Sequence, residues 1–319
     1  IGLFLLTKDI KNINTLIICI LIGGFVRWIS QLWVIKKDLF SISKLKFQVI
    51  NRQILHRYFY AVFSGGLLIL YPVVARSFAS FSEDGSISIV NYALKLVEVP
   101  ANVAVTILSV VILPKLSQMY IEKKRNKFRE IIQINLFWSM AIASAITGVV
   151  IAQSSIFIES IFGLSEAITE KNIEVMSTLL IVGILSLPFQ ALIAVSTSVF
   201  YSEKNTKTPM IINITGFTIL ILLNLLNIND TNVYKIVSFV LISYAITGLI
   251  FITKIEIKHK IINLKFIPLA ISAGGVSYIT SILLNYTNLP LYVNFVLLIC
   301  IVLTILYIFV ALTKKYFLY

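Results

Sequence analysis

The sequence predicts an all-α protein, a polytopic transmembrane helical bundle with nine spans. Of its 319 residues, 58% are hydrophobic and only 13% are charged, whereas soluble domains have roughly 45–50% apolar and about 25% charged residues. The mean hydropathy is +0.95, and the apolar residues form long unbroken runs. These observations exclude a soluble enzyme, a disordered chain and a disulfide-stapled secreted domain. They also exclude a membrane β-barrel, whose strands alternate polar and apolar residues in segments of about ten.

Nine apolar stretches lie between charged residues, and each provides the roughly 20 residues needed to cross a hydrocarbon core of about 30 Å. In chain order the predicted spans are 12–34, 58–80, 85–114, 131–158, 175–201, 208–228, 234–253, 266–286 and 288–313. The longest polar loops are Lys36–Arg57 and Lys115–Glu130, so no soluble domain fits between the spans. Cys19 and Cys300 both lie inside apolar runs with no second ligand nearby, so neither a disulfide nor a metal site is expected.

Glycine and proline mark several of these spans. The pairs Gly23-Gly24, Gly65-Gly66 and Gly274-Gly275 predict places where neighbouring helices approach closely. Pro100 and Pro188 lie within spans and predict kinks there, because proline removes a backbone donor from the helix.

The charge distribution predicts the orientation in the membrane. The net charge is +13, from 27 Lys and Arg residues against 14 Asp and Glu residues. In a soluble protein this excess would indicate nucleic acid, but cytoplasmic loops of membrane proteins collect Lys and Arg. Alternate loops on one side carry twenty of the 27 cations, and the opposite side carries four. We therefore expect a multi-pass protein with a cytoplasmic C-terminus, residues 1–11 outside, and no nucleic-acid partner.

Charges inside the predicted spans are candidate functional residues. Lys95 and Glu98 lie within the segment NYALKLVEVP, and their i,i+3 spacing places both on one helix face. Because a charge at the bilayer centre is costly, such residues usually face a cavity or a partner. Two interpretations stay open: an ion pair that only fixes the helix position, or a cavity-lining pair that meets an anionic substrate.

Two arginines are further candidates. Arg76 lies near the outer end of its span and Arg27 in the cytoplasmic half of another. Each either extends its side chain to the membrane surface or contributes a cation to a substrate site. The sequence contains no HExxH, GxSxG or phosphate-binding GxxxxGK[ST] motif, so we expect no catalytic residues, no metal site and no cofactor.

Three segments carry a family resemblance. One segment, residues 78–117, carries a recurring set of residues. They are Gly85-Ser86, Tyr92-Ala93, Lys95, Leu96, Glu98, Pro100 and the closing Leu113-Pro114-Lys115-Leu116-Ser117. Residues 200–209, FYSEKNTKTP, and residues 23–37, GGFVRWISQLWVIKK, are further matches. Together they resemble the MurJ/MviN family of lipid II flippases. The chain departs from that pattern at Leu94, where the family commonly has Asp, and at Lys95, where it often has Arg.

The resemblance implies the multidrug/oligosaccharidyl-lipid/polysaccharide exporter fold, in its helices six to fourteen. Residues 1–45 would be the last helix of an N-lobe, residues 46–258 a six-helix C-lobe, and residues 259–319 a two-helix hairpin. The implied activity is alternating-access transfer of lipid II, an undecaprenyl-pyrophosphate-linked peptidoglycan precursor, across a bacterial plasma membrane. Lys95, Glu98 and Arg76 would bind this substrate, with Arg27 and Tyr92 as secondary candidates. Membrane lipids and the missing N-terminal helices would be its other partners.

Other functions stay open at this stage. A flippase for O-antigen or teichoic precursors would share the fold, although the Phe-Tyr-Ser…Lys-Thr-Pro turn argues against it. A non-transporting scaffold partner of peptidoglycan synthesis and a membrane glycosyltransferase are the alternatives from other classes. The odd span count and the absence of an initiating Met suggest missing N-terminal spans. We therefore expect that the 319 residues alone do not translocate a precursor.

Overall fold

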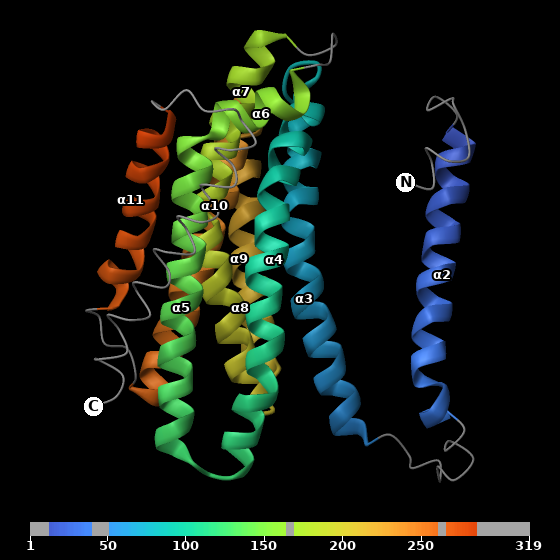
Figure 1. Cartoon of the computed structure of the whole chain (residues 1–319), viewed down its shortest axis with the longest axis vertical. Helices are drawn as coiled ribbons and strands as arrows, with labels where there is room; N and C mark the ends of the chain where they lie inside the picture. Colours follow the sequence, from blue (N-terminus) through green and yellow to red (C-terminus); the bar gives the residue numbers. More distant parts are fainter. Residues whose placement is uncertain (1–12, 40–50, 164–168, 261–265, 286–319) are drawn as a thin grey trace. The chain divides into compact units, whose positions relative to one another are not determined.

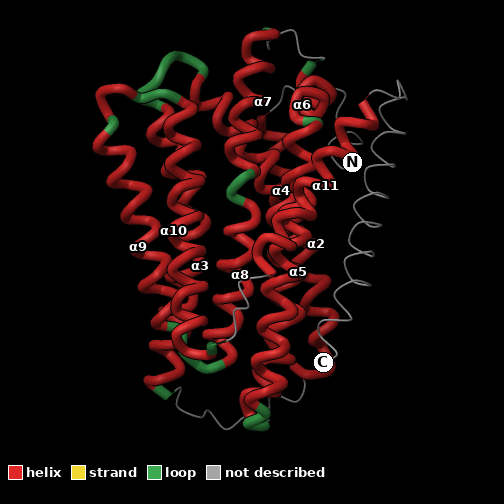
Figure 2. Tube along the Cα trace, turned by 90° about the vertical axis from the view of Figure 1, so that its left-hand side faces the viewer, coloured by secondary structure: helices red, strands yellow, loops and turns green. Residues whose placement is uncertain are grey.

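The computed structural model describes residues 13–39, 51–163, 169–260 and 266–285, and these residues form helices and short connections without any strand (Figures 1 and 2). By internal contacts the chain divides into two units, residues 1–52 and 53–319. The first contains α2 (Ile13–Leu39), whose described side chains are exposed apart from half-buried Cys19. The predicted all-α class is confirmed.

The second unit begins with three long helices and a short one. They are α3 (Arg52–Ala79), α4 (Ser86–Ile121), α5 (Arg125–Ala152) and α6 (Ser154–Phe162). Gly85 precedes α4 with φ +85°, a backbone conformation that glycine adopts without steric cost. The helix α4 is 36 residues long and continues without a break through Pro100 and Pro114.

The remaining helices complete the second unit. They are α7 (Glu170–Ile184), α8 (Leu187–Ser202), α9 (Lys207–Leu226), the 3-10 turn η2 (Ile228–Asp230), α10 (Val233–His259) and α11 (Phe266–Asn285). Side-chain oxygens cap two of them: Thr169 accepts from the backbone N–H of Asn172, and Asn232 accepts from that of Tyr234.

The first eight predicted spans all correspond to helices, and the ninth, 288–313, lies outside the described residues. Five helical segments among the described residues are long and apolar enough to cross a membrane. They are Arg52–Ala79, Arg125–Ala152, Glu170–Ser202, Lys207–Leu226 and Val233–His259.

Two of the predicted spans are each divided between two helices. The prediction of one helix over 131–158 is wrong at its end, because α5 stops at Ala152 and α6 begins at Ser154. Between them, the buried Gln153 donates its side-chain amide to the carbonyl of Ser281 on α11. The span 175–201 is divided between α7 and α8 at residues 185–186. Pro188 lies in the first turn of α8, where its missing N–H is tolerated.

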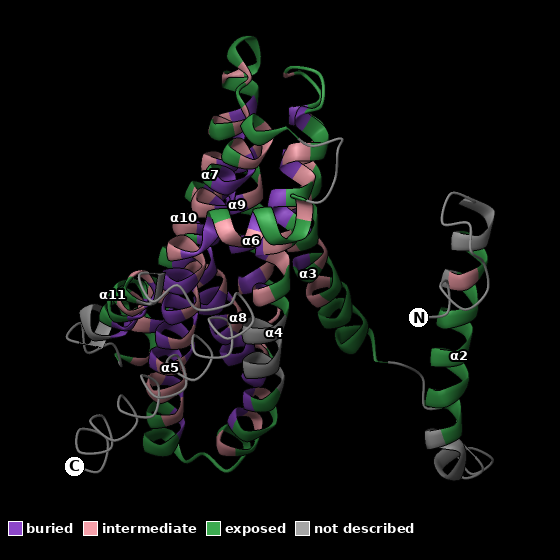
Figure 3. Ribbon diagram, turned by 45° about the horizontal axis from the view of Figure 1, so that its top comes forward, coloured by how far each residue is buried: buried purple, intermediate pink, exposed green. Residues whose placement is uncertain are grey.

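The core of the second unit lies where α4, α5, α8 and α10 meet. The helix α5 packs against α4, α8 and α11, while α10 packs against α7, α8 and α9. Figure 3 shows buried residues concentrated on α5 and α8. Close packing of α5 and α11 depends on glycine, because a Cβ at Gly274 would lie 2.7 Å from the carbonyl oxygen of Ser144. The close approach predicted at the Gly274-Gly275 pair is therefore found, at Gly274.

Buried polar contacts connect α3 to α9 and α10. The Asn213 amide on α9 donates to the Ser64 hydroxyl on α3 at 2.9 Å. The ring of Tyr71 on α3 stacks on that of Tyr244 on α10, with centroids 4.5 Å apart. These contacts place the inner face of α3 beside α10, where the charged residues of α3 and α4 also converge.

Candidate substrate-binding pocket

Three of the charged residues singled out in the sequence lie together. Arg76 on α3 approaches Glu98 on α4, with Nη2 3.0 Å from Oε1. Lys95, one turn before Glu98 on the same helix, contacts the other carboxylate oxygen. Glu98 therefore bridges two cations that come from different helices.

This cluster lines a pocket of about 460 Å³. Four helices contribute to it: Leu68, Ile69, Pro72, Val73 and Arg76 come from α3, Lys95, Glu98, Ala101 and Asn102 from α4, Gln190, Ile193 and Ala194 from α8, and Tyr244 from α10. The walls are mostly apolar, and the charged groups gather on the α3 and α4 sides. Such a pocket suits a ligand with an anionic group and an apolar part.

The charges in the pocket are nearly balanced. Two cations face one carboxylate, which leaves an excess of one positive charge. The side chain of Lys95 is 57% exposed, whereas those of Arg76 and Glu98 are 27% and 28% exposed. The Nε atom of Arg76 is buried and has no hydrogen-bond partner among the described residues. The guanidinium thus keeps an unused donor, which a further acceptor would satisfy.

Sequence reasoning identified the charges of this pocket but not its other polar groups. The i,i+3 spacing gave the Lys95–Glu98 pair, whereas Arg76 is 22 residues from Glu98 and their contact depends on how α3 and α4 pack. Half-buried Gln190, which donates to the Ser186 hydroxyl at 2.8 Å, also lines the pocket. Nothing in the apolar pattern around Gln190 and Tyr244 distinguishes them as pocket residues.

The two secondary candidates lie elsewhere. Tyr92 is on α4, but its ring contacts that of Phe162 on α6 at a centroid distance of 5.0 Å, and it is not among the residues that line the pocket. Arg27 is on α2 in the first unit, where its side chain is exposed and its carbonyl accepts from the Ser30 hydroxyl at 2.7 Å.

The chain is similar to known proteins in sequence and in fold. A family model described as lipid II flippase MurJ matches residues 1–273. A probable lipid II flippase MurJ from Bdellovibrio bacteriovorus is 28% identical over 155 residues, which cover 48% of this chain and 29% of that protein. A solved structure of the lipid II flippase MurJ in an inward closed conformation matches with a TM-score of 0.67 and 21% identity, over 90% of this chain and 60% of the other.

The chain spans less than two thirds of the length of either relative. The structural likeness, at this low identity, establishes the shared helical fold. The family model covers most of the sequence and agrees with the segments that carry the resemblance. The chain is thus a multi-pass helical membrane protein that belongs to the lipid II flippase MurJ family.

Proposed function

We propose that this chain forms part of a lipid II flippase and that the Arg76–Lys95–Glu98 pocket binds the pyrophosphate of the lipid-linked precursor. The observation that carries this proposal is the convergence of two cations and one bridging carboxylate in a pocket between apolar spans. No bond is made or broken in such an activity. The substrate moves between leaflets as two helical lobes alternate in access.

The chemistry of each side chain suits this task. Arg76 offers a planar fork of donors that matches phosphate oxygens, and Lys95 acts as a compact charge. Glu98 pairs with both cations while the pocket is empty and offsets one of their two charges, which lowers the cost of keeping them within the membrane. A pyrophosphate would compete with Glu98 for the same donors, so binding and release would exchange one set of ion pairs for another.

The proposal includes a division of the chain and an orientation. Residues 1–45 would belong to the N-lobe, 46–258 to the C-lobe, and 259–319 to a hairpin that contacts the polyprenyl tail. The Lys- and Arg-rich loops and the C-terminus would face the cytoplasm of a bacterial cell. The family membership and the charge asymmetry of the loops support this assignment.

A binding experiment on the purified 319-residue chain tests the pocket. Fluorescent lipid II in detergent micelles would bind the unmodified chain, and Arg76→Gln and Lys95→Gln would each weaken binding. Losing one charge-assisted hydrogen bond costs about 1.5–3 kcal/mol, or roughly ten- to a hundredfold in Kd. Lys235→Gln is the matched control, because Lys235 pairs with Asp230 outside the pocket.

The outcomes separate the candidate functions. Unchanged binding in both pocket variants would contradict the assigned site. Equal displacement of lipid II by an undecaprenyl-pyrophosphate-linked O-antigen unit would favour the related flippase activity. If the chain bound no lipid-linked precursor at all, the scaffold function would become the better account.

A further inference from the structure

A second charged cavity lies where several helices end. The turn between α4 and α5, the residues that follow α8 and the end of α10 enclose about 770 Å³. None of the residues that line it belongs to the Arg76–Glu98 pocket. The cavity is therefore a separate site, and its chemistry does not depend on the proposed transport function.

Cations dominate the lining of this cavity. Five Lys and Arg side chains from three parts of the chain line it, and all five residues are exposed. They are Lys123, Arg125, Arg129, Lys204 and Lys258. Helix dipoles favour Lys123, Lys204 and Lys258 at helix C-termini but disfavour cations at the start of α5, where Arg125 and Arg129 lie. The cytoplasmic preference for basic residues applies to all five. Neither effect requires them to meet around one cavity.

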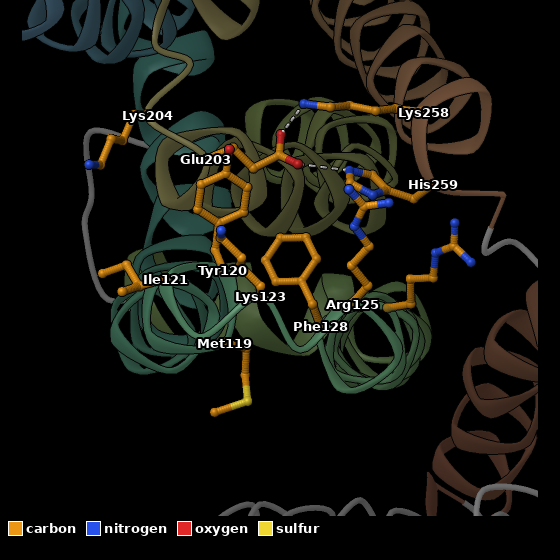
Figure 4. Close-up of a pocket in the computed structure, with 11 residues that line it drawn as sticks. Met119, Tyr120, Ile121, Lys123, Arg125, Phe128, Glu203, Lys204, Lys258 and His259 are labelled. Carbon is orange, nitrogen blue, oxygen red and sulfur yellow. Dashed lines mark hydrogen bonds and ion pairs between the residues drawn. The ribbon is translucent and has the colours of Figure 1, made fainter.

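Glu203 is the carboxylate in the lining, and it is already paired (Figure 4). Its side chain, 3% exposed, contacts Lys258 and lies 3.1 Å from Nε2 of His259, both on α10. The Nε2 atom of His259 has no hydrogen-bond partner among the described residues, so this second contact is a close approach and not a hydrogen bond. The other four cations have no ion-pair partner among the described residues.

Apolar side chains lie directly beside these charges. Ile121 and Tyr120, at the end of α4, line the cavity although they are 70% and 43% exposed. The ring of Phe128 lies between those of Tyr120 and His259, at centroid distances of 5.9 Å and 5.6 Å. A soluble anion would leave this exposed apolar surface in water, whereas an amphipathic ligand would cover it.

Two of the lysines that line this cavity have a left-handed backbone conformation. Lys123 follows α4 with φ +56° and Lys204 follows α8 with φ +61°. Glycine is the residue usually found in this left-handed conformation after a helix. Both turns carry lysine instead, which adds two of the four cations that have no ion-pair partner in the described part of the chain.

We propose that this cavity binds the phosphate of an anionic membrane phospholipid, such as phosphatidylglycerol. The cavity lies at the boundary of three candidate membrane spans, which begin at Arg125 and end at Ser202 and His259. Lipid headgroups lie at this level, and basic pockets between transmembrane helices attract anionic ones. The four cations meet the phosphate, and Ile121 and Tyr120 contact the glycerol and the first carbons of the acyl chains.

Lipid titration of the purified 319-residue chain, followed by native mass spectrometry, tests this site. We expect phosphatidylglycerol to bind more tightly than phosphatidylcholine, and added salt to weaken this preference. The double variant Arg125→Gln/Arg129→Gln would weaken phosphatidylglycerol binding about 25-fold, at about fivefold for each cation. Lys204→Gln, on a different turn, would weaken phosphatidylglycerol binding about fivefold. This single variant tests the site independently if the double variant does not fold.

The matched control is Lys127→Gln/Lys254→Gln, which removes the same charge from exposed residues outside the lining. We expect it to bind phosphatidylglycerol within about twofold of the unmodified chain, because neither lysine lines the cavity. Equal losses in the control and in the double variant would overturn the site. Equal affinity for both lipids would overturn it as well. Displacement of phosphatidylglycerol by the same concentration of soluble glycerol phosphate would overturn the assignment to a lipid.

Discussion

Glu203 is the buried carboxylate that links the end of α8 to the end of α10. Burial alone would raise its pKa, but the contacts with His259 and Lys258 outweigh burial and lower the pKa below its ordinary value. The charged form of Glu203 is thus stabilised in the folded protein. A lowered folded pKa contributes stability above the unfolded pKa, and this contribution disappears as the pH falls through the folded pKa.

Replacement of Glu203 by Gln should therefore destabilise the folded chain in a pH-dependent way. At neutral pH we expect the free energy of unfolding to fall by about 1.5–3 kcal/mol, because the charge-assisted hydrogen bond from Lys258 is removed. The difference in the free energy of unfolding between the variant and the unmodified chain should become smaller below about pH 4.3, the ordinary glutamate pKa.

Thermal unfolding in detergent at several pH values measures this effect. Glu122→Gln is the matched control, since Glu122 pairs with Lys124 on the exposed surface at the end of α4. We expect no measurable change in Tm for the control. If the difference in Tm between Glu203→Gln and the unmodified chain stayed constant from pH 7 down to pH 3, the proposed link between the ionisation of Glu203 and stability would be contradicted.

At the scale of helices, the contact between α5 and α11 depends on the absence of side-chain atoms. A Cβ at Gly274 would meet the carbonyl oxygen and side chain of Ser144, whereas a Cβ at Gly275 would meet nothing within 4 Å. Two adjacent glycines on one helix therefore have different roles. Gly274 permits close packing, and Gly275 only lowers the helix propensity.

This difference predicts opposite effects of two alanine substitutions. Gly274→Ala should destabilise the α5–α11 contact by about 1–3 kcal/mol, because the backbones must separate to admit the new methyl group. Gly275→Ala should leave stability unchanged or raise it by up to about 1 kcal/mol, through better helix propensity. Thermal unfolding of the two purified variants in the same detergent checks this. Equal stability of both variants would mean that α11 does not pack on α5 at this position.

At the scale of the whole molecule, the asymmetry of loop charge defines two ends. The connection before α4 carries Glu83 and Asp84, whereas the turn after it carries Lys123, Lys124 and Arg125. Because α4 connects these two loops, they lie at opposite ends of one long helix (Figure 1). The positive-inside rule then predicts that the α4–α5 turn faces the cytoplasm.

Labelling of single cysteines tests this orientation. On a background with Cys19→Ser and Cys300→Ser, we expect a membrane-impermeant maleimide to label Glu83→Cys in intact cells but not Lys124→Cys. Inverted membrane vesicles should give the opposite result, because their cytoplasmic face is outside. Labelling of Lys124→Cys in intact cells would reverse the assigned topology and place the phospholipid cavity in the outer leaflet.

The sequence by itself determined the helical class and the positions of the first eight spans along the chain, two of which are each divided between two helices. Span length and mean hydropathy are local properties, since every backbone group in a lipid-exposed segment must be satisfied within its own helix. It also determined that Lys95 and Glu98 share a helix face, because i,i+3 neighbours meet on any helix. The end of the fourth predicted span was not determined in this way, since the break at Gln153 involves a contact with Ser281 far along the chain.

Only the tertiary structure decided which residues meet across helices. Arg76 on α3 pairs with Glu98 on α4. Gln190 and Tyr244 line the same pocket. Glu203 pairs with Lys258 and His259, which lie 55 and 56 positions later in the chain. A membrane span that is apolar all round gives no hydrophobic stripe from which its inward face can be read. The rotation of each helix is set by packing against its neighbours, as at Gly274 and Ser144, and this packing brings distant charges into one cavity.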